Sequence, residues 1–283
     1  MVNIRMGGVP EYFNLPILLA LEQGRFAEAG IHLEWQDVPE GTGKMVKALE
    51  AGQLDLVIAL TEGTVKSIAQ GNPAKIIHTY VQSPLNWVVH THATSEAHAI
   101  EDLEGKTFAI SRYGSGSHLM GILMAQTYGW DPAKLSFEEV QNLDGARQAL
   151  ENNTAQIFLW EKYTTKFLVE KGEFKRVGEF LTPWPCFVIA AADKILEKEH
   201  GTIKTLLEVI LQSVREFTTS EQATAQVVER YQLNRKDVED FLPVTQWNTQ
   251  MTLPTAEAQK ALTTLQELGQ LQSAQKIVTQ ALH

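Results

Sequence analysis

Residues 54–63 read LDLVIALTEG, and this stretch decides the fold. Residues 54–60 are all apolar except Asp55, and polar residues bound this run on both sides. Such a run is typical of a strand buried on both faces, as in a parallel sheet. Thr61, Glu62 and Gly63 then lead into a helix that ends near Gly71. The stretch therefore predicts a buried strand whose carboxyl end runs directly into a helix.

The same order of strand and helix extends in both directions from this stretch. Strands separated by helices of about ten residues predict βαβ units and a doubly wound sheet. The predicted strands are 2–6, 31–38, 54–60, 75–81, 106–111, 135–140, 156–160, 176–180 and 186–192. The predicted helices are 16–23, 44–51, 118–128, 144–151, 161–171, 203–217, 223–231, 235–241 and 255–270. The sequence therefore predicts an α/β protein whose last third is mostly helical.

Two halves of the chain echo each other. Residues 48–50 and 149–151 both read ALE, and each triplet precedes a turn, an apolar strand and a glutamate, Glu62 or Glu161. The spacing differs by two residues, and a chance recurrence of ALE in helices is the alternative. We predict two lobes, 1–88 with 190–283 and 89–189, joined by two crossover strands that act as a hinge.

The composition bounds the class of protein. The chain has 283 residues and a formal net charge of −10, which disfavours nucleic acid and anionic membranes as partners. The longest apolar runs fall far short of the ~20 residues of a membrane span. Neither a secretory signal nor a lipobox cysteine is visible, so we expect a periplasmic protein if a leader was removed and a cytoplasmic one otherwise. We expect a monomer.

Four motifs resemble those of a known family. Residues 16–31 read PILLALEQGRFAEAGI, 47–55 read KALEAGQLD, 100–106 read IEDLEGK, and 114–117 read GSGS. In this order they resemble the type 2 periplasmic binding proteins, in the branch that binds nitrate, sulfonates, taurine and thiamine precursors. Within that branch the chain is most similar to a subgroup without obvious secretion signals, related to a yeast binding-protein-like family. The resemblance implies a two-lobed fold with a ligand cleft between the lobes.

Ligands of open α/β sheets bind beyond the carboxyl ends of strands. This rule selects 11–14, 40–43, 61–63, 111–117 and 160–163, with Trp184 near the return crossing. Glycine and hydroxyl residues before helices suit an anionic or acceptor group, although a plain helix cap is the alternative. The aromatic residues suit stacking, although core packing is the alternative. The predicted ligand-binding residues are Tyr12, Phe13, Gly41, Thr42, Thr61, Glu62, Ser111, Tyr113, Ser115, Ser117, Trp160, Glu161 and Trp184.

The ligand class follows from what these stretches contain. Arg112 is their single arginine, and a sulfonate or phosphate site often prefers a bidentate arginine. Glu62 and Glu161 could pair with a cationic or amide-bearing ligand, or could be solvated acids at helix starts. The aromatic and carboxylate set favours a heteroaromatic or amine-containing ligand, such as a pyrimidine.

No pattern for catalysis is evident, and we expect no cofactor and no metal. HExxH, CxxC, GxSxG and P-loop motifs are absent from the sequence. His90 and His92 share one face of a predicted strand, which we interpret as a solvated crossover rather than a metal site. Cys186 has no neighbouring base and is expected to be a buried thiol.

We therefore predict the solute-binding component of an ABC importer, with a small organic ligand and a permease as partners. Sulfonate-like, nitrate-like and pyrimidine-like solutes all remain open. The alternatives are a cytoplasmic ligand sensor and a biosynthetic enzyme of the same fold, of the thiamine-pyrimidine or menaquinone-pathway type.

Overall fold

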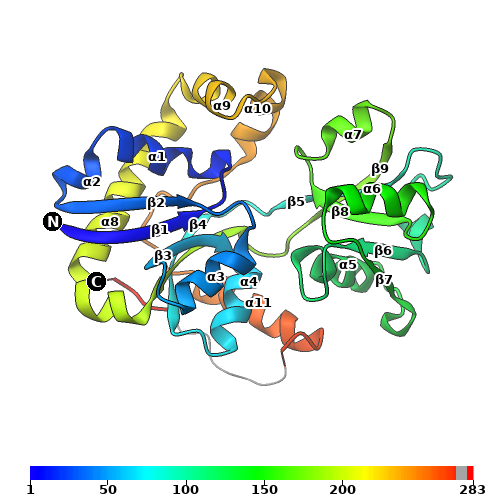
Figure 1. The fold of residues 1–283 in the computed structure, drawn as a ribbon, viewed down its shortest axis with the longest axis horizontal. Coiled ribbons are helices and arrows are strands. Elements are labelled where there is room, and N and C mark those ends of the chain that lie inside the picture. Colours follow the sequence, from blue (N-terminus) through cyan, green and yellow to red (C-terminus); the bar gives the residue numbers. More distant parts are fainter. Residues whose placement is uncertain (272–278, 283) are drawn as a thin grey trace. The chain divides into compact units, whose positions relative to one another are not determined.

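A computed structural model describes residues 1–271 and 279–282. The chain divides into two compact units, residues 1–84 with 184–283 and residues 85–183. Each unit is built on its own five-stranded sheet with helices packed against it (Figure 1). The chain thus crosses from one unit to the other twice, after Pro84 and after Pro183. The predicted lobe boundaries, a few residues away from these crossings, stay a prediction.

The sheet of the first unit has the strand order β2-β1-β3-β10-β4. Its strands are β1 (Val2–Gly8), β2 (Ile31–Asp37), β3 (Leu56–Leu60), β4 (Ala74–Val81) and β10 (Phe187–Ala192). The strands β1, β2 and β3 run parallel, and β10 lies antiparallel between β3 and β4. The 54–60 run is therefore a buried strand as predicted, but its sheet is mixed rather than parallel.

The helices of the first unit pack on both faces of its sheet (Figure 1). They are α1 (Leu15–Glu22), α2 (Arg25–Glu28), α3 (Thr42–Glu50), α4 (Thr61–Ala69), α8 (Asp193–Thr219), α9 (Ala223–Tyr231), α10 (Arg235–Phe241) and α11 (Thr255–Glu267), with 3-10 helices η1 (Tyr12–Asn14) and η4 (Leu242–Val244). The helix α1 packs against α8, while α4 packs against α3 and α11. From β1 to β2 the chain moves across the sheet in one direction, and from β2 to β3 it moves back in the other. The direction in which the sheet is built therefore reverses between the neighbouring strands β1 and β3.

The sheet of the second unit has the order β7-β6-β8-β5-β9. Its strands are β5 (Asn86–His92), β6 (Thr107–Ile110), β7 (Ser136–Glu139), β8 (Ile157–Glu161) and β9 (Phe174–Leu181). Its helices are α5 (Gly116–Thr127), α6 (Leu143–Glu151) and α7 (Lys166–Glu170), with 3-10 helices η2 (Ile100–Leu103) and η3 (Pro132–Lys134). Parallel strands β7, β6 and β8 reverse their winding between β6 and β8, and β5 is antiparallel to both of its neighbours.

The hydrophobic core of the second unit illustrates the packing. Eight buried residues from β6, β8, β9, α6, α7 and the turn before β8 form one cluster: Ala109, Ala146, Ala149, Leu150, Ala155, Phe158, Leu168 and Phe174. Small alanines on α6 let this helix approach the sheet closely, and Phe158 and Phe174 fill the space that remains.

Three predicted elements differ from the structure. A helix over 161–171 is wrong in its first half, because β8 continues to Glu161 and α7 begins only at Lys166. The helix over 203–217 is longer, from Asp193 to Thr219, with a non-helical residue at Glu199. The solvated interpretation of His90 is also wrong, because His90 is 1% exposed and its ring packs against Phe158 and Phe174.

The two fully buried histidines generate a prediction for pH. Burial lowers the pKa of His78 to about 4 and that of His90 to about 4, from an ordinary value of 6.5. The unfolded chain takes up these protons near pH 6.5, so the stability is fully present above that pH and is lost as the pH falls toward 4. Between pH 7 and 5 each histidine should remove about 2 kcal/mol from the free energy of unfolding.

His78→Leu should reduce this pH dependence, because it removes one of the two buried titrating rings. Urea unfolding at both pH values measures it. The exposed His98 supplies the control, His98→Gln. An unchanged pH slope in His78→Leu would contradict the assignment.

Candidate functional site

The carboxyl end of β3 is fastened to the strand that returns from the second unit. The hydroxyl of Thr61 donates to the carbonyl of Pro185 over 2.5 Å, and its backbone N–H donates to the carbonyl of Cys186 over 3.0 Å. Thr61 is 0% exposed. Its polar groups are therefore used within the protein, and it fixes the start of α4 beside the chain that enters β10.

Glu62 and Trp184 are brought together at this place. Trp184 Nε1 donates to Glu62 Oε2 over 2.9 Å, and each side chain is 3% exposed. The second carboxyl oxygen, Glu62 Oε1, is buried and has no hydrogen-bond partner among the described residues. Burial raises the pKa of this carboxyl, and hydrogen bonds from its own backbone N–H and from Trp184 oppose that shift. The pair is therefore a buried polar site in which one carboxyl oxygen lacks a hydrogen-bond partner among the described residues.

Cys186 lies next to this pair and is 1% exposed, which confirms the predicted buried thiol. Burial raises the pKa of the thiol well above its ordinary value, and the nearby Glu62 carboxyl adds to the shift. A thiol in such surroundings stays protonated at neutral pH, so it is a poor nucleophile.

Gly41 and Thr42 begin α3 beside the same strand end. The hydroxyl oxygen of Thr42 accepts the backbone N–H of Leu60 over 3.0 Å. A Cβ atom at Gly63 would lie 2.5 Å from Thr42 Cγ2, so only glycine lets α4 approach Thr42 this closely. Gly41 has a positive φ of 78° at the helix start. Its place at the start of α3 and its packing against α4 therefore account for the contacts of Thr42.

Tyr12 and Phe13 follow β1 and pack within the first unit. Their rings lie 4.1 Å apart, and Tyr12 lies 4.1 Å from Phe241. Phe13 is 5% exposed and lies 4.8 Å from Phe187. The core interpretation accounts for Phe13, while Tyr12 is partly exposed and stays a predicted ligand residue.

Three serines gather at the carboxyl end of β6 and the start of α5. Ser117 Oγ lies 3.3 Å from Ser111 Oγ and 3.1 Å from Ser115 Oγ. The backbone N–H of Ser111 donates to Ser117 Oγ over 3.0 Å, and that of His118 donates to Ser115 Oγ over 3.3 Å. Ser115 is thus the helix cap, and the structure brings the predicted serines into one cluster.

Tyr113 lies in the same loop but is 62% exposed. Its ring meets the His118 ring edge-on at 5.2 Å, and His118 in turn meets Phe137 at 4.6 Å. Gly114 donates its backbone N–H to His118 Nδ1 over 3.0 Å. The loop therefore has a fixed conformation and presents an aromatic ring on its surface.

Trp160 and Glu161 end β8. Trp160 stacks on Phe158 with ring centroids 5.4 Å apart, and it packs against the core cluster of the second unit. Glu161 Oε2 accepts the backbone N–H groups of Tyr163 and Thr164 over 3.0 and 2.9 Å. Burial raises the pKa of Glu161, and these hydrogen bonds oppose the shift. Unlike Glu62, Glu161 uses this oxygen to hold its own turn.

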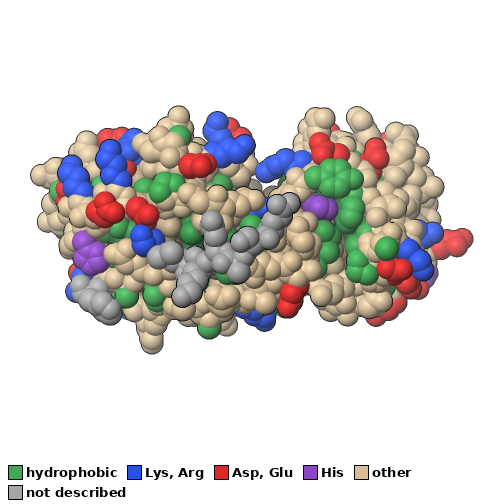
Figure 2. All heavy atoms as spheres, turned by 90° about the horizontal axis from the view of Figure 1, so that it is seen from below, with side chains coloured by type: hydrophobic (Ala, Val, Ile, Leu, Met, Phe, Trp, Pro, Cys, Tyr) green, Lys and Arg blue, Asp and Glu red, His purple; other side chains and the backbone are tan. Residues whose placement is uncertain are grey.

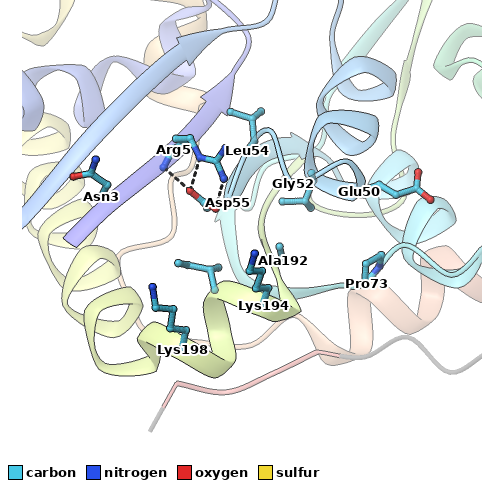
Figure 3. A pocket seen from close by; sticks show the side chains of 12 residues that line it. Asn3, Arg5, Glu50, Gly52, Leu54, Asp55, Pro73, Ala192, Lys194 and Lys198 are labelled. Carbon is cyan, nitrogen blue, oxygen red and sulfur yellow. Dashed lines mark hydrogen bonds and ion pairs between the residues drawn. The ribbon is translucent and has the colours of Figure 1, made fainter.

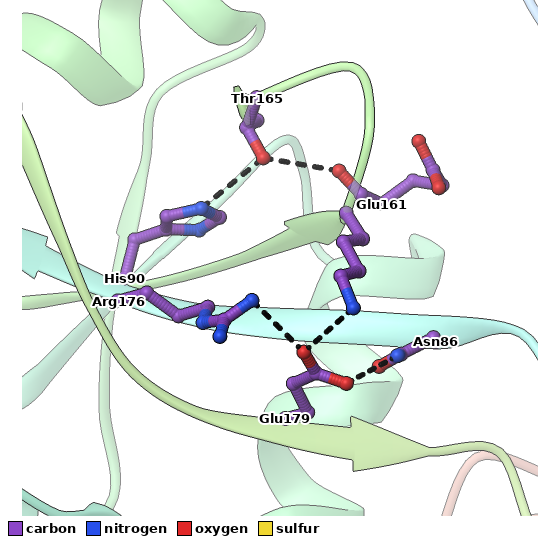
Figure 4. Close-up of polar contacts among 7 residues, drawn as sticks. Asn86, His90, Glu161, Thr165, Arg176 and Glu179 are labelled. Carbon is purple, nitrogen blue, oxygen red and sulfur yellow. Dashed lines mark hydrogen bonds and ion pairs between the residues drawn. The ribbon is translucent and has the colours of Figure 1, made fainter. Parts of the chain in front are cut away.

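The turn after β8 is also fastened to β5 (Figure 4). The hydroxyl of Thr165 donates to the carbonyl of Glu161 over 3.0 Å and lies 3.1 Å from His90 Nε2. A second group of contacts surrounds the Glu179 carboxylate, where Lys162 lies 3.0 Å from one oxygen. His90 is thus a buried structural residue that positions the turn, not a metal ligand.

Trp87 is not among the ligand-binding residues predicted from the sequence. Trp87 is 6% exposed, and its Nε1 is buried without a hydrogen-bond partner in the described part of the chain. Its position on β5 beside α5 could not be read from a local motif, because the contact joins segments about thirty residues apart.

A pocket of about 400 Å³ lies in the first unit at the opposite ends of β1 and β3 from the residues described above (Figure 3). It is lined by the first half of β1, the turn before β3 and the first turns of α8, with Arg5 bound to Asp55 in a bidentate ion pair. Lys194 and Lys198 rise from α8 on one side of it (Figure 3). None of the predicted ligand residues lines this pocket.

Two further searches covered residues 1–271 and 279–282. None of the helices there is long and apolar enough to cross a membrane. No three His, Cys, Asp or Glu side chains there are placed to hold a metal ion. Figure 2 shows acidic and basic side chains interspersed on the face it presents.

Comparison with known proteins agrees with this architecture. Residues 87–180 match the model of a family described as Ca3427-like periplasmic binding proteins. The conserved CA3427 gene product of Candida albicans has a TM-score of 0.86 and 24% identity, covering 98% of this chain and 93% of that one. No curated protein sequence matches the chain.

Two sulfonate-binding proteins have the same fold. The periplasmic aliphatic sulphonate binding protein SsuA of Escherichia coli has a TM-score of 0.75 and 16% identity, covering 98% of this chain and 90% of that one. The alkanesulfonate-binding protein SsuA of Xanthomonas axonopodis pv. citri, bound to MOPS, has a TM-score of 0.75 and 15% identity, covering 98% and 96%. The resemblance suggested by the sequence motifs, including the yeast-like subgroup, is confirmed. The chain has the type 2 periplasmic-binding-protein fold, and its second unit carries the sequence pattern of the Ca3427-like branch.

Proposed function

We propose that the chain is a solute-binding protein that holds one small organic molecule with residues from both units, which close around it. The observation that carries this proposal is the buried Glu62 carboxyl, one oxygen of which has no partner among the described residues. It stands where the winding of the first sheet reverses, at the carboxyl end of β3. Ligands of open α/β sheets bind at such reversals.

A ligand would complete this site. A buried polar group without a partner costs about 1–3 kcal/mol, and more when it is charged. A ligand amine or amide N–H donating to Glu62 Oε1 would remove that cost. The α5 start in the second unit offers donors instead, from the serine hydroxyls and the helix N-terminus. The two units therefore differ in the ligand groups that they favour.

Glu62 favours an amine-bearing or heteroaromatic ligand over a simple sulfonate. An ionised carboxylate in an apolar site repels a sulfonate and attracts a cation. The sulfonate-binding proteins of the same fold argue instead for a sulfonate ligand. A role in ABC import is part of the proposal, with the permease as the partner of the loaded protein.

Ligand class can be tested by thermal unfolding in the presence of candidate solutes. We expect an aminopyrimidine to raise the melting temperature more than ethanesulfonate, which carries no amine, does. A ligand at a hundred times its Kd stabilises the folded chain by about 2.7 kcal/mol, which is several degrees for a chain of this size.

Calorimetry should confirm the solutes that shift the melting temperature. Mass spectrometry before and after incubation should recover the ligand unchanged, whereas product formation would favour an enzyme. Tight binding of sulfonates with no binding of amines or pyrimidines would refute the proposed ligand class while keeping the binding function.

Glu62→Gln tests the carboxyl directly. Glutamine keeps the size of the side chain and an oxygen that can accept from Trp184, but it carries no charge. Affinity for an amine-bearing ligand should fall about tenfold or more, because a hydrogen bond to a charged group is worth about 1.5–3 kcal/mol. Isothermal calorimetry measures the change.

Glu257→Gln is the matched control, since Glu257 also lies in the first turn of a helix in the first unit but is exposed. The melting temperature of ligand-free Glu62→Gln should be unchanged or higher, because no charge remains buried. Equal affinities of Glu62→Gln and the unaltered protein would remove Glu62 from the ligand site.

A further inference from the structure

The pocket of about 400 Å³ in the first unit takes no part in the proposed function. All of the residues that line it belong to the first unit. Asp55 of this lining and Glu62 of the candidate site flank β3, one at each end. The strand has five residues, so at about 3.3 Å per residue its two ends lie more than about 13 Å apart. The pocket is therefore separate from the candidate site.

One wall of the pocket is held in place by Arg5 and Asp55 (Figure 3). Arg5 Nε and Nη2 donate to the two carboxyl oxygens of Asp55 over 2.9 and 2.7 Å. The backbone N–H of Ala192 donates to the carbonyl of Asp55 over 3.0 Å. These contacts join β1, the turn before β3 and the end of β10. Arg5 Nη1 is not used in them, so the guanidinium keeps N–H groups that can meet a ligand.

Two lysines form another side of the pocket. Lys194 and Lys198 are four residues apart on α8, so their side chains share one face of the helix. Neither ammonium group has an ion-pair partner among the described residues, whereas Asp193 beside them lies 2.6 Å from Lys75. Like charges at this spacing repel each other. An anion between the two lysines would attract both and would offset that repulsion.

The lining is cationic, although the chain as a whole has a net charge of −10. The acidic residues of the lining are Asp55, which is paired with Arg5, and Glu50. Figure 3 shows Glu50 across the pocket from α8, with its carboxylate pointing away from the lysines. The charges of Lys194 and Lys198 are therefore not compensated within the lining.

Apolar side chains line the pocket beside these charges. They are Leu49, Leu54 and Ile195, and the two leucines are 2% and 1% exposed. Since a buried side chain in a packed core has little freedom to move, the leucines give the pocket a fixed apolar surface. A ligand that contacts both parts of the lining needs an anionic group and a small apolar body.

We infer that this pocket is a second ligand site, which binds a small organic phosphate monoester. The phosphate lies between Lys194 and Lys198, and the apolar part of the ligand lies against Leu49, Leu54 and Ile195. A phosphate monoester carries close to two negative charges at neutral pH, which match the two lysines, whereas a carboxylate carries one. A volume of about 400 Å³ lies within the range of small-molecule sites. The inference goes beyond the proposed function and does not depend on Glu62.

The test follows the backbone amide signals of the full chain by ¹H–¹⁵N NMR during a titration with phenyl phosphate. Small fragments bind weakly, so the titration extends through the millimolar range. We expect the amides of Gly52 and Ile195, which line the pocket from two segments, to shift. Inorganic phosphate should shift them only at higher concentration, because it lacks the apolar part. Benzylamine, which is of similar size but cationic, should leave them in place.

The double variant Lys194→Gln/Lys198→Gln should weaken phenyl phosphate binding about tenfold, or about 1.4 kcal/mol, because two exposed ion pairs are lost. Both lysines are exposed, so the melting temperature should not change. The matched control is Lys236→Gln/Lys260→Gln, which alters the net charge equally at two exposed lysines of the first unit outside the pocket. The control should bind phenyl phosphate as the unaltered protein does.

Amides of Gly52 and Ile195 that phenyl phosphate does not move would overturn the inference. Equal affinities of Lys194→Gln/Lys198→Gln and the unaltered protein would overturn it as well, and so would benzylamine shifts as large as those of phenyl phosphate. None of these results bears on the proposed function, because Glu62→Gln should leave phenyl phosphate binding in the pocket unchanged.

Discussion

The insertion of β10 between β3 and β4 is the interaction on which the first unit depends. The chain leaves this unit after Pro84 and returns at Trp184, so its sheet is completed by a segment about a hundred residues further on. Five residues of β10 pair with β3, and β10 also pairs along β4. The approach to β10 carries Trp184 and Cys186 directly past the start of α4. Without this pairing, Glu62 would lose the indole N–H of Trp184 as a donor, and Thr61 would lose both of its carbonyl acceptors.

Several buried side-chain atoms have no hydrogen-bond partner among the described residues, and Glu62 Oε1, Trp87 Nε1 and both ring nitrogens of His78 belong to them. Thr42, Thr61 and the three serines make hydrogen bonds that fix the turns, whereas Glu62 Oε1 and Trp87 Nε1 make none among the described residues. Each such group costs about 1–3 kcal/mol. Glu62 Oε1 lies just after the end of β3, so under the proposed function a ligand would offset this cost there.

The sequence predicted the order of elements well, because apolar runs and glycine stops are local signals. The 54–60 run became β3, and 235–241 became α10 with the predicted bounds. The mixed character of the sheets could not be predicted, since an antiparallel strand such as β10 has the same apolar composition as a parallel one. His90 shows the same limit: alternation marked it as facing one side, but only its contacts with Phe158 and Phe174 in the structure show that this side is buried.

For the candidate site, too, the positions of residues along the chain could be predicted and their contacts with distant segments could not. Residues chosen for their place after a strand, such as Glu62 and Ser117, lie where the rule put them, but the rule could not tell which carry spare hydrogen-bonding capacity. Glu62 and Glu161 have the same local context, after an apolar strand, yet Glu161 is turned back onto Tyr163 and Thr164 while Glu62 is held by a tryptophan from the return crossing.

This difference sets the chemistry of the first unit. Burial raises the pKa of Glu62, and a protonated Glu62 would donate where an ionised one accepts. One carboxyl in one place can therefore hold an amine in its ionised form or an acceptor oxygen in its neutral form, and the ligand's own charge sets which form prevails. A cation stabilises the carboxylate, and an anion stabilises the acid at the cost of taking up a proton. Under the proposed function, the preference for one ligand class over the other would rest on this proton equilibrium at Glu62.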